Sequence, residues 1–224
     1  MELLEAIKAR HSVRSYQDKP LSAEIVNKLK QEIDICNGES GLHMQLVVNE
    51  PNAFDGLMAH YGKFSGVKNY LAIIGKKGKD AEEACGYYGE RIALYAQTLG
   101  LNTCWVAMTY SKIKTAFQVG TDEKLHLVIA LGYGTTQGTP HKSKPKERVM
   151  DTAAAPPDWF VRGVEAALLA PTAMNQQKFK FSLNGTVVSA KPDLGFYSTI
   201  DLGIAKYHFE VGAGKEQFQW AAEK

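Results

Sequence analysis

The sequence has few cysteines and lacks the features that mark membrane proteins. Cys36, Cys85 and Cys104 stand far apart, with no Cys-x-x-Cys pair and no histidine at metal-ligand spacing beside them. We therefore expect reduced, structural thiols and no zinc site. No apolar run approaches the roughly 20 residues that span a bilayer. The N-terminus carries charge inside an amphipathic pattern, unlike a secretory signal, so we expect a cytoplasmic chain without a membrane role.

The sequence also lacks an excess of either charge and lacks a Rossmann signature. Lys and Arg number 26 against 24 Asp and Glu, which gives a net charge of +2. Such a chain has no long-range field to attract nucleic acid, and no basic stripe is interleaved with aromatic residues. No Gly-x-Gly-x-x-Gly follows a strand-like segment, so we expect any nicotinamide to bind transiently.

What is present is the composition of an ordinary globular protein. Of 224 residues, 45% are hydrophobic and 22% are charged, and no Pro-, Gly- or Ser-rich linker divides the chain. These features predict a single domain over residues 1–224. We expect it to consist of two halves that share a core, at about 1–150 and 151–224.

Hydrophobic periodicity predicts helices and strands in mixed order. A short helix carries Leu3, Leu4 and Ile7, and a second begins at a Ser22 cap and stops at Asn37-Gly38. Further helices are predicted over about 80–99, from Ser111, over about 158–168 and over about 201–212. Strands are predicted at 43–48, 70–75, 102–107, 125–131, 179–183 and 186–190. A polar loop carrying Lys142, Lys144, Lys146 and Arg148 precedes the second half.

Two parts of the first half recur weakly in the second half. The helix and strand over 24–47 match 159–182 with the apolar phase preserved. The segment Gly89 to Gly100 similarly matches Gly203 to Gly214. Because amphipathic helices resemble each other by chance, a true internal repeat and a coincidence both stay open.

The pentapeptide Arg10-His11-Ser12-Val13-Arg14 is the first candidate site. In an extended segment, Arg10, Ser12 and Arg14 project from one side. Two guanidinium forks and a hydroxyl suit a phosphate group, because each fork can donate two charge-assisted hydrogen bonds. A solvated basic turn explains the same pentapeptide when it is taken alone.

Four segments together resemble the FMN-dependent nitroreductase family. The Arg-x-Ser-x-Arg motif after a short helix resembles the family's phosphate-binding opening, and Leu99 to Val106 is similar to its Leu-Gly-Leu-Gly-Thr-Cys-Trp stretch. The strand and basic loop over 128–149 look like its last core strand and tail. The family's Ala-Pro-Ser-x-x-Asn loop is absent after the second helix, but 170–179 resembles it. This late loop is typical of a divergent branch of nitroreductases, and Asp201 to Ala205 resembles the family's Asp-x-Gly-x-Ala helix start.

The resemblance implies an α+β fold with a central, mostly antiparallel sheet flanked by helices. Family members are commonly homodimers in which two subunits complete each flavin site, so this chain is interpreted as a single-chain pseudo-dimer with one FMN. Whether it stays a monomer or pairs into a homodimer is left open. The resemblance and the motif together predict these cofactor-binding residues: Arg10, His11, Ser12, Arg14, Val106, Ala107, Met108, Lys142, Lys144, Pro171, Thr172 and Asn175.

The expected activity is that of an NAD(P)H oxidoreductase, a flavoprotein enzyme that reduces small acceptors such as nitroaromatics or quinones. Hydride transfer through flavin requires no catalytic side chain, and one shared pocket implies ping-pong turnover with NADH or NADPH as donor. The sequence leaves three alternatives open: a flavin-binding, storage or sensing protein with little turnover, a relative that dehalogenates or fragments flavin, and a scaffold without cofactor.

Overall fold

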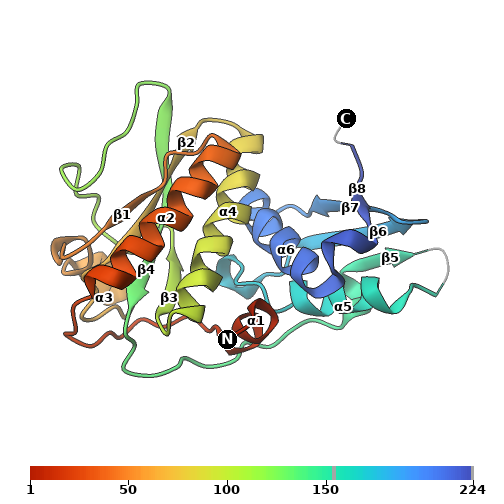
Figure 1. The fold of residues 1–224 in the computed structure, drawn as a ribbon, viewed down its shortest axis with the longest axis horizontal. Coiled ribbons are helices and arrows are strands. Elements are labelled where there is room, and N and C mark those ends of the chain that lie inside the picture. Colours follow the sequence, from red (N-terminus) through yellow and green to blue (C-terminus); the bar gives the residue numbers. More distant parts are fainter. Residues whose placement is uncertain (153–154, 223–224) are drawn as a thin grey trace.

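The computed structural model describes residues 1–152 and 155–222, arranged as two parts that lie side by side (Figure 1). The helices are α1 (Leu3–Ala9), α2 (Ala23–Ser40), α3 (Leu57–Tyr61), α4 (Lys79–Thr98), α5 (Asp158–Ala167) and α6 (Ser198–Ala213). The strands are β1 (Gln45–Val47), β2 (Tyr70–Lys76), β3 (Asn102–Val106), β4 (Glu123–Gly132), β5 (Met150–Thr152), β6 (Phe179–Asn184), β7 (Val187–Pro192) and β8 (Gln219–Trp220). Short 3-10 helices are η1 (Asn52–Phe54), η2 (Lys146–Arg148), η3 (Ala173–Asn175) and η4 (Lys215–Gln217).

The first sheet has the strand order β1-β2-β4-β3, and every pairing in it is antiparallel. Alternate residues of β2 face opposite sides: Leu71 and Ile73 join the core beneath α2 and α4, whereas Ala72 and Ile74 join a second apolar cluster. Burial on both faces explains why β2 is a continuous apolar run. The predicted α+β class, with an antiparallel sheet flanked by helices, is confirmed.

The second sheet has the order β5-β6-β7-β8 and mixed directions. β6 and β7 form an antiparallel hairpin, while β5 and β8 run parallel to their neighbours. The chain between β4 and β5 runs along the lower edge of the molecule, from the first part to the second (Figure 1). One apolar cluster includes Leu71 of the first sheet and Phe181 and Phe209 of the second part, so the two parts share a core.

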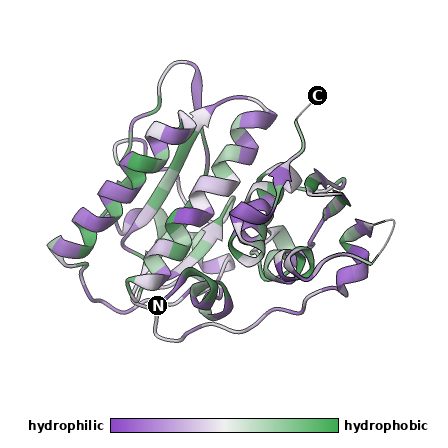
Figure 2. Ribbon diagram, turned by 45° about the vertical axis from the view of Figure 1, so that its right-hand side comes forward, coloured by the Kyte–Doolittle hydropathy of each residue, from purple (hydrophilic) through white to green (hydrophobic). Residues whose placement is uncertain are grey.

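Helix boundaries follow local signals, with two corrections. Ser22 caps α2 as predicted, because its Oγ accepts a hydrogen bond from Ile25 N at 3.3 Å. The predicted stop at Asn37-Gly38 is wrong, since α2 continues to Ser40 and ends at Gly41, whose φ of +68° suits glycine. Hydrophobic and hydrophilic stretches alternate along α2 as it turns (Figure 2).

The predicted helix after Ser111 is also wrong, because residues 111–122 form turns and no helix. Ser111 N instead donates to Ala53 O at 2.7 Å, which ties the segment to η1. Ile113 and Phe117 then pack against the second apolar cluster. Tertiary contacts therefore outweigh a weak local helix signal.

Helices α4 and α6 cross at two glycines with matching surroundings. A Cβ on Gly86 would lie 2.0 Å from Ile200 O, and a Cβ on Gly203 would lie 2.0 Å from Glu83 O. Glu83 precedes Gly86 by three residues, as Ile200 precedes Gly203. The backbone contacts of the crossing are therefore related by an approximate two-fold symmetry. This symmetry pairs Gly203 with Gly86, whereas the internal sequence match had aligned Gly203 with Gly89.

Apart from the short 3-10 helices and the helix α3 between β1 and β2, the order helix, strand, strand, helix, strand also recurs between the two parts. It comprises α2, β1, β2, α4 and β3 in the first part, and α5, β6, β7, α6 and β8 in the second. In the first sheet, β4 lies between β2 and β3, whereas in the second sheet the corresponding strands β7 and β8 pair directly. No helix among the described residues is long and apolar enough to cross a membrane.

Candidate active site

The basic pentapeptide lies in an extended segment that is pinned at several points. Arg10 is the C-cap of α1, and its N–H donates to Ala6 O. Val13 N donates to Thr103 O at 3.1 Å, beside the start of β3, and Ser65 N donates to Arg14 O at 2.9 Å. The predicted extended conformation therefore arises from bonding to strands and loops on both sides.

A cavity of about 590 Å³ opens over this segment; we call it the basic cavity. Its lining comes from residues within 10–15, 136–141 and 171–175, together with Lys63. Five of these residues can carry positive charge, namely Arg10, His11, Arg14, Lys63 and His141. No aspartate or glutamate occurs among the described lining residues, so the cavity has the electrostatic character of an anion site.

Arg10 is the least accessible of these cations, with only 2% of its surface exposed. Its Nε lies 3.5 Å from Glu90 Oε1. Neither Nε nor Nη1 has a hydrogen-bond partner among the described residues. A buried guanidinium with unused donors is costly, and a bound anion would satisfy it. Desolvation lowers the pKa of His11, and the charges of Arg10 and His141 lower that pKa further.

A second, smaller pocket of about 150 Å³ adjoins the basic cavity; we call it the inner pocket. Ser12, Arg14, Pro171, Thr172 and Met174 line both. The end of β3 supplies Trp105, Val106 and Ala107 to the inner pocket, and α6 supplies Ile200, Asp201 and Ile204. Of the three predicted residues after the tryptophan, Val106 and Ala107 line the inner pocket, whereas Met108 is exposed outside its lining.

The loop over residues 171–177 is held in an unusual backbone shape. Met174, Asn175 and Gln177 have φ angles of +52°, +54° and +45°. Non-glycine residues in this region cost about 1–3 kcal/mol each, so other contacts must hold them there. Much of this support comes from Asp201, whose Oδ1 accepts from Ala173 N at 3.0 Å and whose Oδ2 accepts from Gln176 Nε2 at 2.7 Å.

Asp201 is itself buried, with 3% of its surface exposed. Burial raises its pKa from 3.8 to about 6, against the opposing effect of the hydrogen bonds from Gln176 and from Ala173 N. Desolvation therefore outweighs hydrogen bonding at this carboxyl group.

Gln177 ties the 171–177 loop to the lysine-rich segment. Its Nε2 donates to Lys142 O at 2.8 Å, and its Oε1 accepts from Lys144 N at 2.8 Å. Lys144 Nζ donates to Gln177 O at 3.0 Å. Neither Lys142 nor Lys144 is among the residues that line the basic cavity. His141, which directly precedes Lys142 in the sequence, lines the cavity instead.

The side chains of the loop are partly engaged by the protein itself. Asn175 Nδ2 donates to Lys142 O at 2.9 Å, and Asn175 Oδ1 accepts from Gln177 Nε2 at 2.8 Å. Thr172 Oγ1 accepts from Gln177 N at 3.1 Å. Both residues line the basic cavity, but these hydrogen bonds also stabilise the loop.

Sequence reasoning missed one residue that lines the basic cavity, Lys63, and two buried residues that lie outside its lining, Glu90 and His208. Lys63 follows the short helix α3 at a φ of +61°, and no motif singled it out. Glu90 and His208 were missed because their periodic positions on helices read as ordinary core positions. The one available signal was their polarity: both are charged or titratable residues within otherwise apolar helix faces, and both are 0% exposed.

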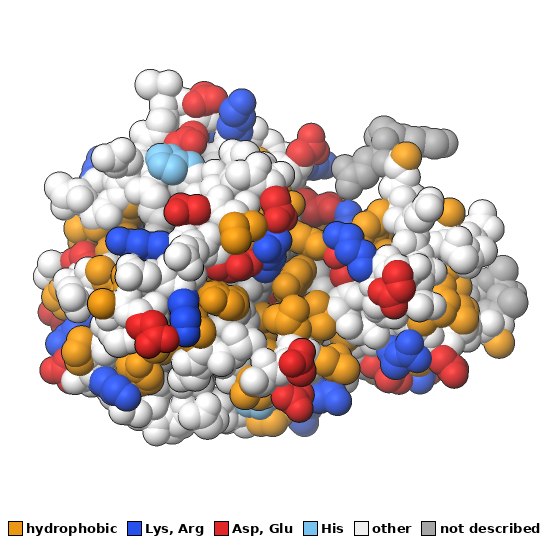
Figure 3. Space-filling model, in the orientation of Figure 1, with side chains coloured by type: hydrophobic (Ala, Val, Ile, Leu, Met, Phe, Trp, Pro, Cys, Tyr) orange, Lys and Arg blue, Asp and Glu red, His pale blue; other side chains and the backbone are white. Residues whose placement is uncertain are grey.

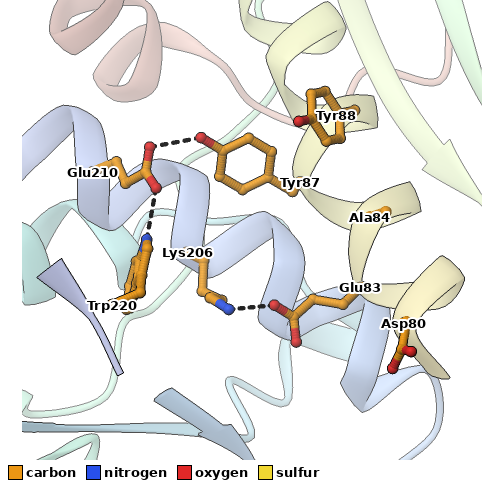
Figure 4. Close-up of a pocket in the computed structure, with 8 residues that line it drawn as sticks. All are labelled: Asp80, Glu83, Ala84, Tyr87, Tyr88, Lys206, Glu210 and Trp220. Carbon is orange, nitrogen blue, oxygen red and sulfur yellow. Dashed lines mark hydrogen bonds and ion pairs between the residues drawn. The ribbon is translucent and has the colours of Figure 1, made fainter. Parts of the chain in front are cut away.

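A different cavity, of about 260 Å³, lies between α4 and α6 (Figure 4). Three of its charged groups have partners within the chain: Glu210 accepts hydrogen bonds from Tyr87 and Trp220, and Lys206 forms an ion pair with Glu83. On this face of the molecule, charges of both signs are interspersed, with hydrophobic side chains between the two parts (Figure 3). This cavity therefore lacks the surplus positive charge of the basic cavity.

The fold and the site define a mixed α+β protein with a carboxylate-free basic cavity that leads into a pocket beside a tryptophan. A family model described as "Putative TM nitroreductase" matches residues 2–213. The chain belongs to this family. No curated protein sequence matches the chain.

Several solved structures have a similar fold. A "putative nitroreductase" from Thermotoga maritima is 23% identical, with a TM-score of 0.70 over 100% of this chain and 90% of that chain. A "putative nitroreductase in complex with FMN" from Desulfovibrio desulfuricans is 20% identical, with a TM-score of 0.55 over 70% and 98% of the two chains. A "putative NADH dehydrogenase/NAD(P)H nitroreductase" from Bacteroides thetaiotaomicron is 18% identical, with a TM-score of 0.51 over 66% and 95%. At these identities the likeness shows the fold.

Proposed function

We propose that this protein binds one FMN per chain and acts as an NAD(P)H oxidoreductase on small acceptors such as nitroaromatics or quinones. One observation carries the proposal. The arginine segment 10–14 and the loop 171–175 lie far apart in the sequence, yet they line the same cavity. A single chain thus supplies both a phosphate end and a ring end of a flavin site, as expected for a single-chain pseudo-dimer.

The residues present fit the cofactor. The unused donors of buried Arg10 match a phosphate dianion, and Ser12 and Arg14 extend the same surface. Ser12 and Arg14 also line the inner pocket, so one elongated ligand can occupy both spaces. His11 lines the cavity beside Arg10 at the phosphate end, and Pro171, Thr172 and Asn175 of the 171–175 loop line the same cavity.

FMN, when bound, would supply the hydride-transfer chemistry between a nicotinamide and a second substrate. The protein positions the cofactor and surrounds it. Trp105, Val106 and Ala107 supply an apolar wall at the ring end, which excludes water from one side. No side chain needs to act as a nucleophile, and donor and acceptor use the same opening in turn.

The first experiment is the absorption spectrum of the purified protein, followed by identification of the chromophore released by heat. We expect FMN at one per chain. The variant in which Arg10 and Arg14 are both replaced by Ala should lose FMN, and full FMN occupancy in that variant would contradict the phosphate assignment. Lys142→Ala serves as the matched control, because this lysine lies outside the cavity lining.

Steady-state oxidation of NADH and NADPH with menadione or a nitroaromatic acceptor tests the activity. Turnover with either donor supports the oxidoreductase. A protein that holds FMN stoichiometrically but oxidises neither donor would instead be a flavin-binding or storage protein.

A further inference from the structure

A buried charge cluster lies behind the basic cavity and joins both halves of the chain. Arg10 follows α1, Glu90 lies on α4 and His208 lies on α6. Glu90 and His208 are 0% exposed, and neither lines the basic cavity or the inner pocket. Their nearest link to the site is through Arg10, which lines the basic cavity, and through Trp105, which lines the inner pocket.

Glu90 contacts three side chains through its two carboxyl oxygens. Its Oε2 accepts a hydrogen bond from Trp105 Nε1 at 2.7 Å. Its Oε1 lies 2.9 Å from His208 Nε2 and 3.5 Å from Arg10 Nε. One carboxylate therefore contacts the ring-end tryptophan, the phosphate-end arginine and a histidine of the second half.

The net charge of this cluster follows from the contacts of the histidine. His208 Nδ1 lies 3.0 Å from Ala166 O, so both ring nitrogens face oxygen atoms. A neutral imidazole carries one N–H, so two such contacts need a second proton, either on His208 or on Glu90. In both cases the Glu90–His208 pair is neutral as a whole, and the charge of Arg10 stays uncompensated.

We propose that His208 and Glu90 are positioning residues that set the affinity of the basic cavity for a phosphate group by acting through Arg10. His208 offsets the charge of Glu90 and so keeps Glu90 from neutralising Arg10. The uncompensated charge of Arg10 is then available to an anion in the cavity. This inference rests on the proposed function in that FMN supplies the phosphate.

The test compares FMN with riboflavin, which has the same ring and no phosphate. The full-length chain, freed of flavin, is titrated with each ligand, and binding is followed by flavin fluorescence. The measured quantity is the ratio of the two affinities. A purely structural role of the cluster would change both affinities together and leave the ratio unaltered.

His208→Gln retains a donor toward Glu90 but removes the second proton. We expect the preference for FMN over riboflavin to fall by about tenfold, as the Coulomb energy of one charge at several ångströms implies. Glu90→Gln removes the carboxylate and, with it, the need for the second proton, so the pair stays neutral and we expect that preference to stay near the wild-type value. A fall in His208→Gln that Glu90→Gln does not share distinguishes a charge effect from a loss of packing.

Glu210→Gln is the matched control. Glu210 lies on α6 and, like Glu90, is a buried carboxylate; it accepts hydrogen bonds from a tyrosine and a tryptophan. It lies outside the lining of both the basic cavity and the inner pocket. The FMN preference of this variant should equal that of the wild type. An unchanged ratio in His208→Gln would overturn the inference, as would an equal fall in His208→Gln and Glu90→Gln.

If His208→Gln fails to fold, His208→Asn takes its place: a fall in the ratio supports the inference, and an unchanged ratio overturns it. Failure of the proposed function would look different. In that case the wild type itself would bind FMN no better than riboflavin, or would bind neither.

Discussion

Gly86 of α4 and Gly203 of α6 each lie against the backbone of the other helix, with matching neighbours. A Cβ at either position would lie 2.0 Å from a carbonyl oxygen, that of Ile200 or that of Glu83. The shared core of the two halves therefore depends on the absence of side chains at this crossing. Since α6 also presents Asp201 to the inner pocket, the crossing helps to place the site.

Gly86→Ala and Gly203→Ala should each lower the free energy of unfolding by about 3 kcal/mol, because the added methyl group meets backbone that cannot move without separating the helices. Urea denaturation measures this change. Gly38→Ala is the control: Gly38 lies within α2 and a Cβ there has nothing within 4 Å, so this change should stabilise the protein by about 0.5–1 kcal/mol. Equal effects at the three glycines would contradict the tight crossing.

Asp201→Asn should alter how stability depends on pH. The folded-state pKa of Asp201 is about 6, above the ordinary value of 3.8, so the folded protein binds the proton more tightly than the unfolded chain does. This contribution to stability is complete below about pH 4 and is lost as the pH rises to about 6. The wild type should therefore lose about 3 kcal/mol relative to Asp201→Asn over that range.

Denaturant titrations of both proteins at several pH values between about 3.5 and 7 measure this difference in the free energy of unfolding directly. A difference that stays constant with pH, or one in which the wild type gains stability as the pH rises, would show that the carboxyl group is not desolvated as the structure indicates.

Lys63 and Lys142 should differ in their effect on FMN binding. Lys63 lines the basic cavity, whereas Lys142 contributes its carbonyl oxygen to the loop contacts and is not among the lining residues. An exposed charge near a bound anion contributes about 0.5–1 kcal/mol. Lys63→Ala should therefore weaken FMN binding by about two- to fivefold, while Lys142→Ala should leave it unchanged; titrations at low and high salt check both.

Because salt screens exposed charges, the difference between Lys63→Ala and the wild type should shrink at high ionic strength. A stronger effect for Lys142→Ala than for Lys63→Ala would restore the sequence-based assignment of the clamp to the lysine-rich loop.

Gln177→Leu should loosen the contact between the 171–177 loop and the segment around Lys142. The substitution preserves volume but leaves Lys144 N without its 2.8 Å partner, whereas Lys142 O keeps the hydrogen bond from Asn175 Nδ2. An unsatisfied polar group costs about 1–3 kcal/mol, so the free energy of unfolding should fall by about that amount. Limited proteolysis should cut residues 136–145 faster in this variant, and an unchanged cleavage rate would count against this role of Gln177.

The parts of the fold that local signals control were predictable. Ser22, Gly100 and the apolar run of β2 mark element boundaries through contacts within a few residues, and the structure has those boundaries within a few positions. The failures occurred where local and tertiary contacts compete. Gly38 can read as a helix stop but fits inside α2, and Ser111 can read as a cap but donates to Ala53 instead.

The candidate site divides in the same way. The sequence by itself determined that Arg10, Ser12 and Arg14 alternate along the chain, and it predicted at residues 170–179 a segment that resembles a loop of the nitroreductase family. The sequence could not determine that His141, and not Lys142, lines the cavity. Neighbouring side chains of a loop point in different directions, and the backbone conformation of the loop decides which of them points inward.

Only the tertiary structure decided that Glu90 and His208 lie behind Arg10. Periodicity places a residue on a helix face, but the packing of α4 against α6 determines which groups meet at that face. The charge of a buried residue matters through its neighbours, and those neighbours come from parts of the chain that no local pattern relates. The sequence thus specified the chemical groups of this protein, and the fold decided which of them act together.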